Sequence, residues 1–424
     1  MAKVVQVPIF ILALSALAGP LRAQHESRQA MPSAKKDPLR ALVAAEVHFI
    51  VKVCGLPAGE ADELAKVASQ ATDDVALRLT EARSNRNWRS SEAPVTITSE
   101  IDRVLKPRLS KPSWLRLHTE RTLLATRLRH AAIELLLASL DELLLLDDEQ
   151  RVELRDLLRQ KWAGAWRPPE SWRGLLHADR TPWQRATTRG ALALVCFPKA
   201  ELKRVLRPSQ CAASNQAAFY AQQLLLKDRS AGAYWRKEPL FGLSLERLGA
   251  AVELSQAERT KLRLAGKLDL DGNSATQRVS PPNASTGYMV DGLLPAGMLP
   301  EDVPAYVKAV GSILGDEQSR GFDNATRERW RFHQSADLHS IVAACQRRCV
   351  LTVAQCDDLL DILRERLPEA GQQTYDRRAT FAAVADVPAS QWEDICDEFQ
   401  IELIAKCLAE LHEVVRDCEQ KGRQ

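Results

Sequence analysis

The feature that most constrains this chain is an internal repeat of helix-starting motifs about 200 residues apart. Residues 146–159 (LDDEQRVELRDLLR) align without a gap with residues 351–364 (LTVAQCDDLLDILR), sharing six of fourteen positions at an offset of 205. Weaker matches occur in the same order at offsets of 198, 199 and 190: 56–64 with 254–262, 113–114 with 312–313, and 198–210 with 388–400. Ordered repetition at a nearly constant offset is typical of a duplicated structural unit. The sequence therefore predicts a tandem duplication.

Both copies are predicted to be helical, which makes the expected fold all-α. The only clear β-branched cluster lies at residues 95–98, whereas apolar residues elsewhere recur at helical spacing. In residues 119–146, one helix face carries Leu124, Leu128, Ala131, Leu135 and Ala138, and another carries Ile133, Leu136, Leu140 and Leu144. A helix that is apolar on two sides is expected at the centre of its domain.

Several helix starts can be placed from capping patterns. Thr352-x-x-Gln355 and Ser255-x-x-Glu258 have the capping-box form, and Asp147-x-x-Gln150 can make the same pair of bonds. Pro198 and Pro388 suit the first turn of a helix, where no N–H bond is lost. These motifs start helices and carry no catalytic chemistry.

Composition divides the chain into two copies, residues 24–240 and 241–424, with the junction near residues 240–247. Within the second copy, residues 266–304 are rich in Gly, Pro, Asn and Ser and show little periodicity. This composition predicts a long loop, and the shorter, more basic stretch 84–112 is expected to correspond to it in the first copy.

The N-terminus has the order of a secretory signal peptide. Lys3 precedes an apolar run over residues 4–17, a Gly-Pro break follows, and Leu21-Arg22-Ala23 leads into a polar stretch. We expect cleavage after Ala23, which gives a mature chain located in the periplasm or secreted. The alternative is an uncleaved anchor, because residues 4–21 approach the roughly 18 apolar residues that a membrane span needs.

The mature chain is expected to be almost neutral. Cleavage removes Lys3 and Arg22 and no acidic residue, so Lys+Arg falls from 58 to 56 against 55 Asp+Glu. A nucleic-acid partner would require a basic excess, so none is predicted. No integral membrane span is predicted after cleavage, because even residues 133–146 contain three acidic side chains.

Nine cysteines are present, and none lies in a C-x-x-C motif. Cys345 and Cys349 are four residues apart, and Cys396, Cys407 and Cys418 recur every 11 residues, so each set should share a helix face. Cysteines on a buried helix face mostly act as small hydrophobic residues, which is the interpretation we favour over a metal or redox site.

Four short blocks taken together resemble a group of uncharacterised secreted helical proteins from planctomycete bacteria. They are the signal peptide, residues 259–266 (RTKLRLAG), residues 311–314 (GSIL) and residues 351–355 (LTVAQ). The sequence departs from that pattern where Gly266 is followed by Lys267 instead of Asp. The resemblance implies a bacterial, extracytoplasmic setting and brings no known activity or site residues.

Two stretches contain side chains that could bind a metal ion. Asp269, Asp271 and Asn273 begin like a calcium loop, but Ser274 replaces the required glycine, so a polar linker is favoured. In His333-x-x-x-Asp337-x-His339, only the first two residues share a helix face, and no third ligand is identifiable. No metal, cofactor or catalytic residue is therefore predicted.

The strongest compositional anomaly is the placement of four of the nine tryptophans within residues 162–183. Trp162 and Trp166 are one helical turn apart and are expected to pack where helices meet. Tryptophan beside arginine on a loop also suits an interaction or sugar-stacking surface. The candidate binding residues are Trp172, Arg173, Arg180 and Trp183.

These features favour an extracytoplasmic, non-catalytic protein with a structural or interaction role and an unknown protein or glycan partner outside the cytoplasm. The alternative is a secreted enzyme or ligand-binding protein acting on cell-wall or polysaccharide material, which the tryptophan cluster and the export signal suggest. No local catalytic motif supports that alternative, although acid pairs on separate helices leave none.

Overall fold

The computed structural model describes residues 37–68, 102–161, 199–215, 237–273, 304–367 and 377–422. These residues form helices and no strand, so the all-α prediction is confirmed for this part of the chain. The helices are α1 (Asp37–Cys54), η3 (Lys106–Arg108), α4 (Lys111–Leu144), α5 (Asp148–Lys161), α8 (Lys199–Val205), α10 (Lys237–Ala251), α11 (Gln256–Asn273), α12 (Pro304–Ile313), α13 (Asp316–Cys349), α14 (Val353–Arg366), α15 (Arg377–Ala385), α16 (Ala389–Glu393) and α17 (Glu398–Gly422).

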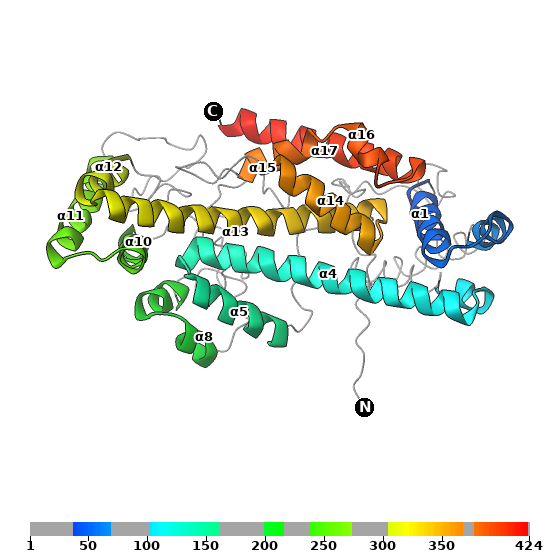
Figure 1. The fold of residues 1–424 in the computed structure, drawn as a ribbon, viewed down its shortest axis with the longest axis horizontal. Helices are drawn as coiled ribbons and strands as arrows, with labels where there is room; N and C mark the ends of the chain where they lie inside the picture. Colours follow the sequence, from blue (N-terminus) through cyan, green and yellow to red (C-terminus); the bar gives the residue numbers. More distant parts are fainter. Residues whose placement is uncertain are drawn as a thin grey trace, which may run out of the picture.

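The two long helices, α4 and α13, run side by side through the middle of the molecule (Figure 1). They are antiparallel, because Leu124 of α4 contacts Gln346 late in α13, whereas Asp141 at the far end of α4 contacts Arg329 early in α13. Helices α5 and α8 lie on one side of this pair, and α14 to α17 lie on the other (Figure 1). At the ends of the pair, α1 packs on α4 and α10 packs on α13, and α11 and α12 lie beside α10 (Figure 1).

Helix α4 buries two different faces, as its sequence predicts. Leu124 and Leu135 belong to the largest apolar cluster, which they share with α1, α13, α14 and α17. Ile133, Leu136 and Leu140 belong to a second cluster with α5 and α8. Helix α4 therefore contributes to two apolar cores. Full burial of each leucine side chain in them contributes about 1.5–3 kcal/mol to stability.

The segments around α4–α5 and α13–α14 have the same local geometry. Helices α4 and α13 each contain 34 residues, α5 and α14 each contain 14, and all four pairs of helix ends differ by 205 in residue number. Each long helix stops at a left-handed residue, Leu145 at φ 49° and Val350 at φ 53°. That conformation is unfavourable for a β-branched residue such as valine, so the surrounding packing must hold it.

The predicted capping boxes are present. In Thr352–Gln355 the two bonds measure 2.9 and 3.4 Å, in Ser255–Glu258 they measure 2.7 and 3.3 Å, and in Asp147–Gln150 they measure 3.2 and 2.9 Å. Each box pairs the backbone N–H of the capping residue with the third side chain of the helix, and the reverse bond completes it. Pro388 differs from its prediction, because it is the N-cap of α16 and precedes the first turn.

Two predicted boundaries fall within helices. Helix α11 continues to Asn273, so the loop expected over residues 266–304 does not begin at Gly266; residues 274–303 lie outside the described ranges. The predicted junction at residues 240–247 lies inside helix α10. Glycine costs a helix only about 1 kcal/mol relative to alanine, which the flanking helix-forming residues of α11 offset. Glycine content alone therefore placed the loop start too early.

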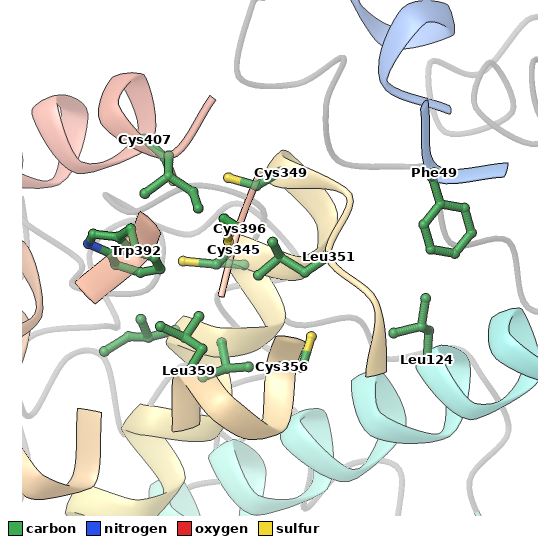
Figure 2. Packing of buried hydrophobic residues seen from close by; sticks show 14 of the residues in the cluster. Phe49, Leu124, Cys345, Cys349, Leu351, Cys356, Leu359, Trp392, Cys396 and Cys407 are labelled. Carbon is green, nitrogen blue, oxygen red and sulfur yellow. The ribbon is translucent and has the colours of Figure 1, made fainter. Parts of the chain in front are cut away.

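The largest apolar cluster contains six cysteines and Trp392 (Figure 2). Cys345, Cys349, Cys356, Cys396 and Cys407 are all buried, which confirms that these residues lie inside the protein. Across the helices whose side chains are described, none combines the length and apolarity that crossing a bilayer requires.

Candidate functional site

A buried charged group joins α4, α5 and α13 and is the most distinctive polar feature of the described residues. Asp141 has no exposed surface, and its carboxylate accepts a hydrogen bond of 2.5 Å from Nε of Arg329. Nε2 of His333 lies 2.7 Å from the same carboxylate oxygen, and Nη1 of Arg151 lies 3.3 Å from the other. We call Asp141, Arg151, Arg329 and His333 the Asp141 cluster.

The helices place each of these side chains. Asp141 lies one turn before the end of α4, in a segment rich in leucine. Arg329 and His333 are four residues apart on α13 and therefore share the face that meets α4. Arg151 comes from α5, which folds back along α4 after the left-handed residue Leu145. The sharp turn after α4 is thus what brings Arg151 to the carboxylate.

Opposing effects act on the Asp141 carboxyl group. Burial raises its pKa, but Arg329, His333 and Arg151 together outweigh that effect and hold the pKa well below its usual range. The carboxylate therefore remains ionised at neutral pH. Removing one partner from a buried ion pair commonly costs about 3–5 kcal/mol, because the other charge is left without compensation.

The equivalent positions at the other end of the helix pair are neutral. Gln346 lies 205 residues after Asp141, and Leu124 and Cys356 occupy the positions that correspond to the two arginines of the cluster. Nε2 of Gln346 donates to the backbone oxygen of Leu124 at 3.4 Å, and Sγ of Cys356 lies 4.0 Å from Oε1 of Gln346. Arg329 likewise donates to the backbone oxygen of Asp141 at 3.0 Å. The two ends thus use the same positions with different chemistry.

Two pairs of buried glutamines hold the shorter helices to their neighbours. Gln150 and Gln210 exchange amide hydrogen bonds of 2.7 and 2.9 Å, and Gln355 and Gln400 exchange bonds of 2.7 and 3.1 Å. Every one of these glutamines also donates to a backbone carbonyl oxygen nearby. Each pair therefore satisfies several buried polar groups at once, which makes it costly to break.

Two imidazole rings meet between α4 and α13. The rings of His130 and His339 are in edge-to-face contact with centroids 4.9 Å apart, and Glu134 lies 3.5 Å from Nε2 of His130. Burial, followed by the neighbouring His130, lowers the pKa of His339 to about 4. Burial likewise lowers the pKa of His130. Both rings are therefore neutral at pH 7.

The histidines weighed as metal ligands lie in different environments. His333 belongs to the Asp141 cluster, whereas His339 contacts His130. No group of three metal-ligating side chains is suitably placed in the part of the chain that the structure describes. Residues 269–273, which begin like a calcium loop, are helical and form the end of α11. Because residues 269–273 are helical, the interpretation of that stretch as a polar linker is wrong.

A shallow depression on the surface lies between α10 and the segment after α8. It is lined by Arg207, Pro208, Glu246, Gly249, Ala250 and Arg259. Its charged side chains bond to protein groups: Arg207 pairs with Asp147, Glu246 accepts from Ser209, and Nε of Arg259 donates to Leu254 O at 3.4 Å. These contacts join neighbouring helices.

The candidate binding residues Trp172, Arg173, Arg180 and Trp183 lie outside the described residues, as do the signal peptide at residues 1–23 and Trp162 and Trp166. The Asp141 cluster was not predicted from the sequence. The available signal was an acidic residue near the end of an apolar run, matched by an uncharged glutamine 205 residues later. Comparison of the chain with protein-family models, with curated proteins and with solved structures gave no match.

Proposed function

We propose that this chain is an exported protein with a non-catalytic, structural or interaction role. The observation that carries the proposal is the use of buried polar side chains. The Asp141 cluster bonds α4 to α5 and α13, and the Gln355–Gln400 pair bonds α14 to α17. Polar groups arranged to join helices give a rigid frame, which suits a protein that presents its surface to a partner.

The proposal includes a duplication, in which two copies of a roughly 200-residue helical unit form the frame. Its support is the constant offset of 205 at the ends of α4, α5, α13 and α14, together with the matching glutamine pairs. A further support is the symmetry of the contacts. Asp141 meets Arg329, and shifting both positions by 205 gives the contact between Gln346 and Leu124. Two copies related by an approximate two-fold axis produce this exchange.

Export and role can be tested with the protein isolated from its native host. The intact mass should correspond to a chain that begins at Gln24 and should be found outside the cytoplasm. Chemical cross-linking in the extracytoplasmic fraction should give one defined complex of the protein with a partner. The Asp141→Asn variant should form the same complex at temperatures below the melting temperature of that variant. A turnover activity on wall or polysaccharide material that a single substitution removes, while the fold is retained, would contradict the proposed role.

A second candidate is a ligand-binding protein or enzyme acting on polysaccharide, and the tryptophan cluster at residues 162–183 is the observation that favours it. Aromatic side chains stack on sugar rings at little entropic cost. Glycan-array binding by the mature protein should then fall in Trp172→Ala and Trp183→Ala, and should be unaffected in the control Trp114→Ala. Binding that is absent or unchanged would remove the second candidate.

A further inference from the structure

Four buried cysteines gather where α13 meets α17. Cys345 and Cys349 lie on the last turns of α13, Cys407 lies on α17, and Cys396 lies just before α17 (Figure 2). All four belong to the largest apolar cluster, and Trp392 packs beside them. Cysteine packs as a small hydrophobic residue, but four thiols in one place also form a site for thiol chemistry.

Among these side chains, Cys349 and Cys407 lie in one buried cluster, and Cys407 is the neighbour with the strongest effect on the Cys349 thiol. They come from different helices that pack against each other. Cys349 is the last residue of α13, directly before the left-handed Val350, so its position is fixed by the turn into α14. A bond between the two sulfurs would link the end of α13 to α17, and an unstrained disulfide requires Cα atoms about 4.4–6.8 Å apart, as packed neighbouring helices allow.

We propose that Cys349 and Cys407 form a disulfide when the exported chain folds, which rests on the export included in the proposed function. The oxidant is a small-molecule or protein disulfide, such as glutathione disulfide. One cysteine loses its proton and attacks the oxidant, releasing one thiol, and the second cysteine then displaces the other. The S–S bond of the oxidant is broken, the Cys349–Cys407 bond forms, and the oxidant leaves as two thiols.

The surroundings also determine when the bond can form. The hydrogen bond with Cys407, followed by burial, raises the pKa of the Cys349 thiol well above its usual value. The thiolate is the reactive form, so the folded, reduced protein should react slowly. Before α17 docks, both thiols are exposed to solvent and have ordinary reactivity. The disulfide therefore forms during folding, and reduction of the folded protein should be slow as well.

The test is refolding of the full mature chain with glutathione in mixed oxidised and reduced forms, compared with refolding in reductant alone. Oxidative refolding should lower the intact mass by about 2 Da and give a digest fragment joining Cys349 to Cys407. It should also raise Tm by about 5 °C or more, because the bond restricts a long loop in the unfolded chain. The folded, reduced protein should acquire the bond far more slowly.

Matched variants make the result decisive. Cys349→Ala and Cys407→Ala should each lose the cross-linked fragment and the rise in Tm, whereas Cys211→Ala, outside the cluster, should keep both. Their Tm after reducing refolding reports whether the alanine variants are folded. Refolded protein that retains free thiols at Cys349 and Cys407, or pairs either with another cysteine, would overturn the proposal.

The role of export is tested separately. Protein taken from the native host, with thiols blocked at lysis, should contain the bond if the chain is exported. The bond could form in refolding, while the native protein is found in the cytoplasm without it. That result would overturn both the export and the disulfide in vivo, and only the preference of Cys349 for Cys407 in refolding would stand. Exported protein with both thiols free would overturn the disulfide alone.

Discussion

Residues at corresponding positions of this fold differ in charge and in the side chains that they contact. Asp141 and Gln346 occupy equivalent places near the ends of two 34-residue helices, yet one is a fully buried carboxylate with two arginines and the other is an amide beside Leu124 and Cys356. The apolar run that contains Asp141 is visible in the sequence, but the partners of Asp141 are not. The partners come from α5 and α13, and contacts between antiparallel helices cannot be read from the spacing within one of them.

Asp141→Asn should strongly destabilise the protein. The substitution leaves Arg329 and Arg151 buried without their counter-charge, so the free energy of unfolding should fall by about 3–5 kcal/mol. Urea unfolding followed by circular dichroism measures this change. Asp357→Asn is the matched control, since its exposed ion pair with Arg127 is worth at most about 1 kcal/mol. If the two substitutions lowered the free energy of unfolding equally, the Asp141 cluster would be exposed to solvent, which would contradict its burial.

His339 should make stability depend on pH. Its pKa of about 4 in the folded protein lies below the ordinary value of 6.5, so the unfolded chain binds the extra proton first as pH falls. This stabilising contribution is fully present above pH 6.5 and is lost as pH falls through about 4. Tm measured across that range should fall less steeply in His339→Gln, whereas the exposed His412→Gln should follow the wild type. Identical slopes would contradict the assignment.

At the scale of helices, local signals predicted the starts well and the ends poorly. The three capping boxes are where the sequence placed them, because a cap and its partner lie within four residues of each other. The start of the loop at Gly266 was wrong, because α11 continues to Asn273 and a single glycine costs a helix only about 1 kcal/mol. The same reasoning explains the glutamine pairs: Gln150 and Gln355 are recognisable in the sequence as capping partners, but the glutamine that each one bonds is 60 or 45 residues away.

Gln150→Ala and Gln355→Ala should destabilise the protein to a similar extent. Each removes one half of a buried amide pair and leaves the other glutamine and backbone carbonyls without partners, which costs about 1–3 kcal/mol per unsatisfied group. Chemical denaturation of both variants measures the effect, with the exposed Gln256→Ala as control. A large loss in one variant and none in the other would contradict the equivalence of the two pairs.

At the scale of the whole molecule, the antiparallel packing of α4 and α13 produces matching contacts near both ends of the helix pair. The repeat with an offset of 205 could be read from the sequence, but the antiparallel packing could not, because a repeat fixes the similarity of two segments and not their relative orientation. The binding candidates Trp172 and Trp183 remain predictions.

Because the two ends use corresponding positions, we expect that all four residues of the Asp141 cluster can be replaced together by their neutral counterparts. A quadruple variant carrying Asp141→Gln, Arg151→Cys, Arg329→Leu and His333→Leu copies the neutral end, where Leu128 corresponds to His333. It should recover most of the stability lost in Asp141→Gln alone, because removing a whole buried ion group is often neutral whereas breaking it is costly. Tm of both variants gives the comparison. Additive losses would argue that the two ends are not equivalent.

The contrast between the ends of the helix pair also bears on which amino-acid changes each end tolerates. The carboxylate of Asp141 keeps its charge far below the pH at which free carboxylates titrate, so mild acid does not discharge it. Removing one of its partners leaves a buried charge without compensation, whereas the amide of Gln346 beside Leu124 and Cys356 carries no charge that could be left unpaired. Random substitution should therefore be selected against more strongly around Asp141 than around Gln346.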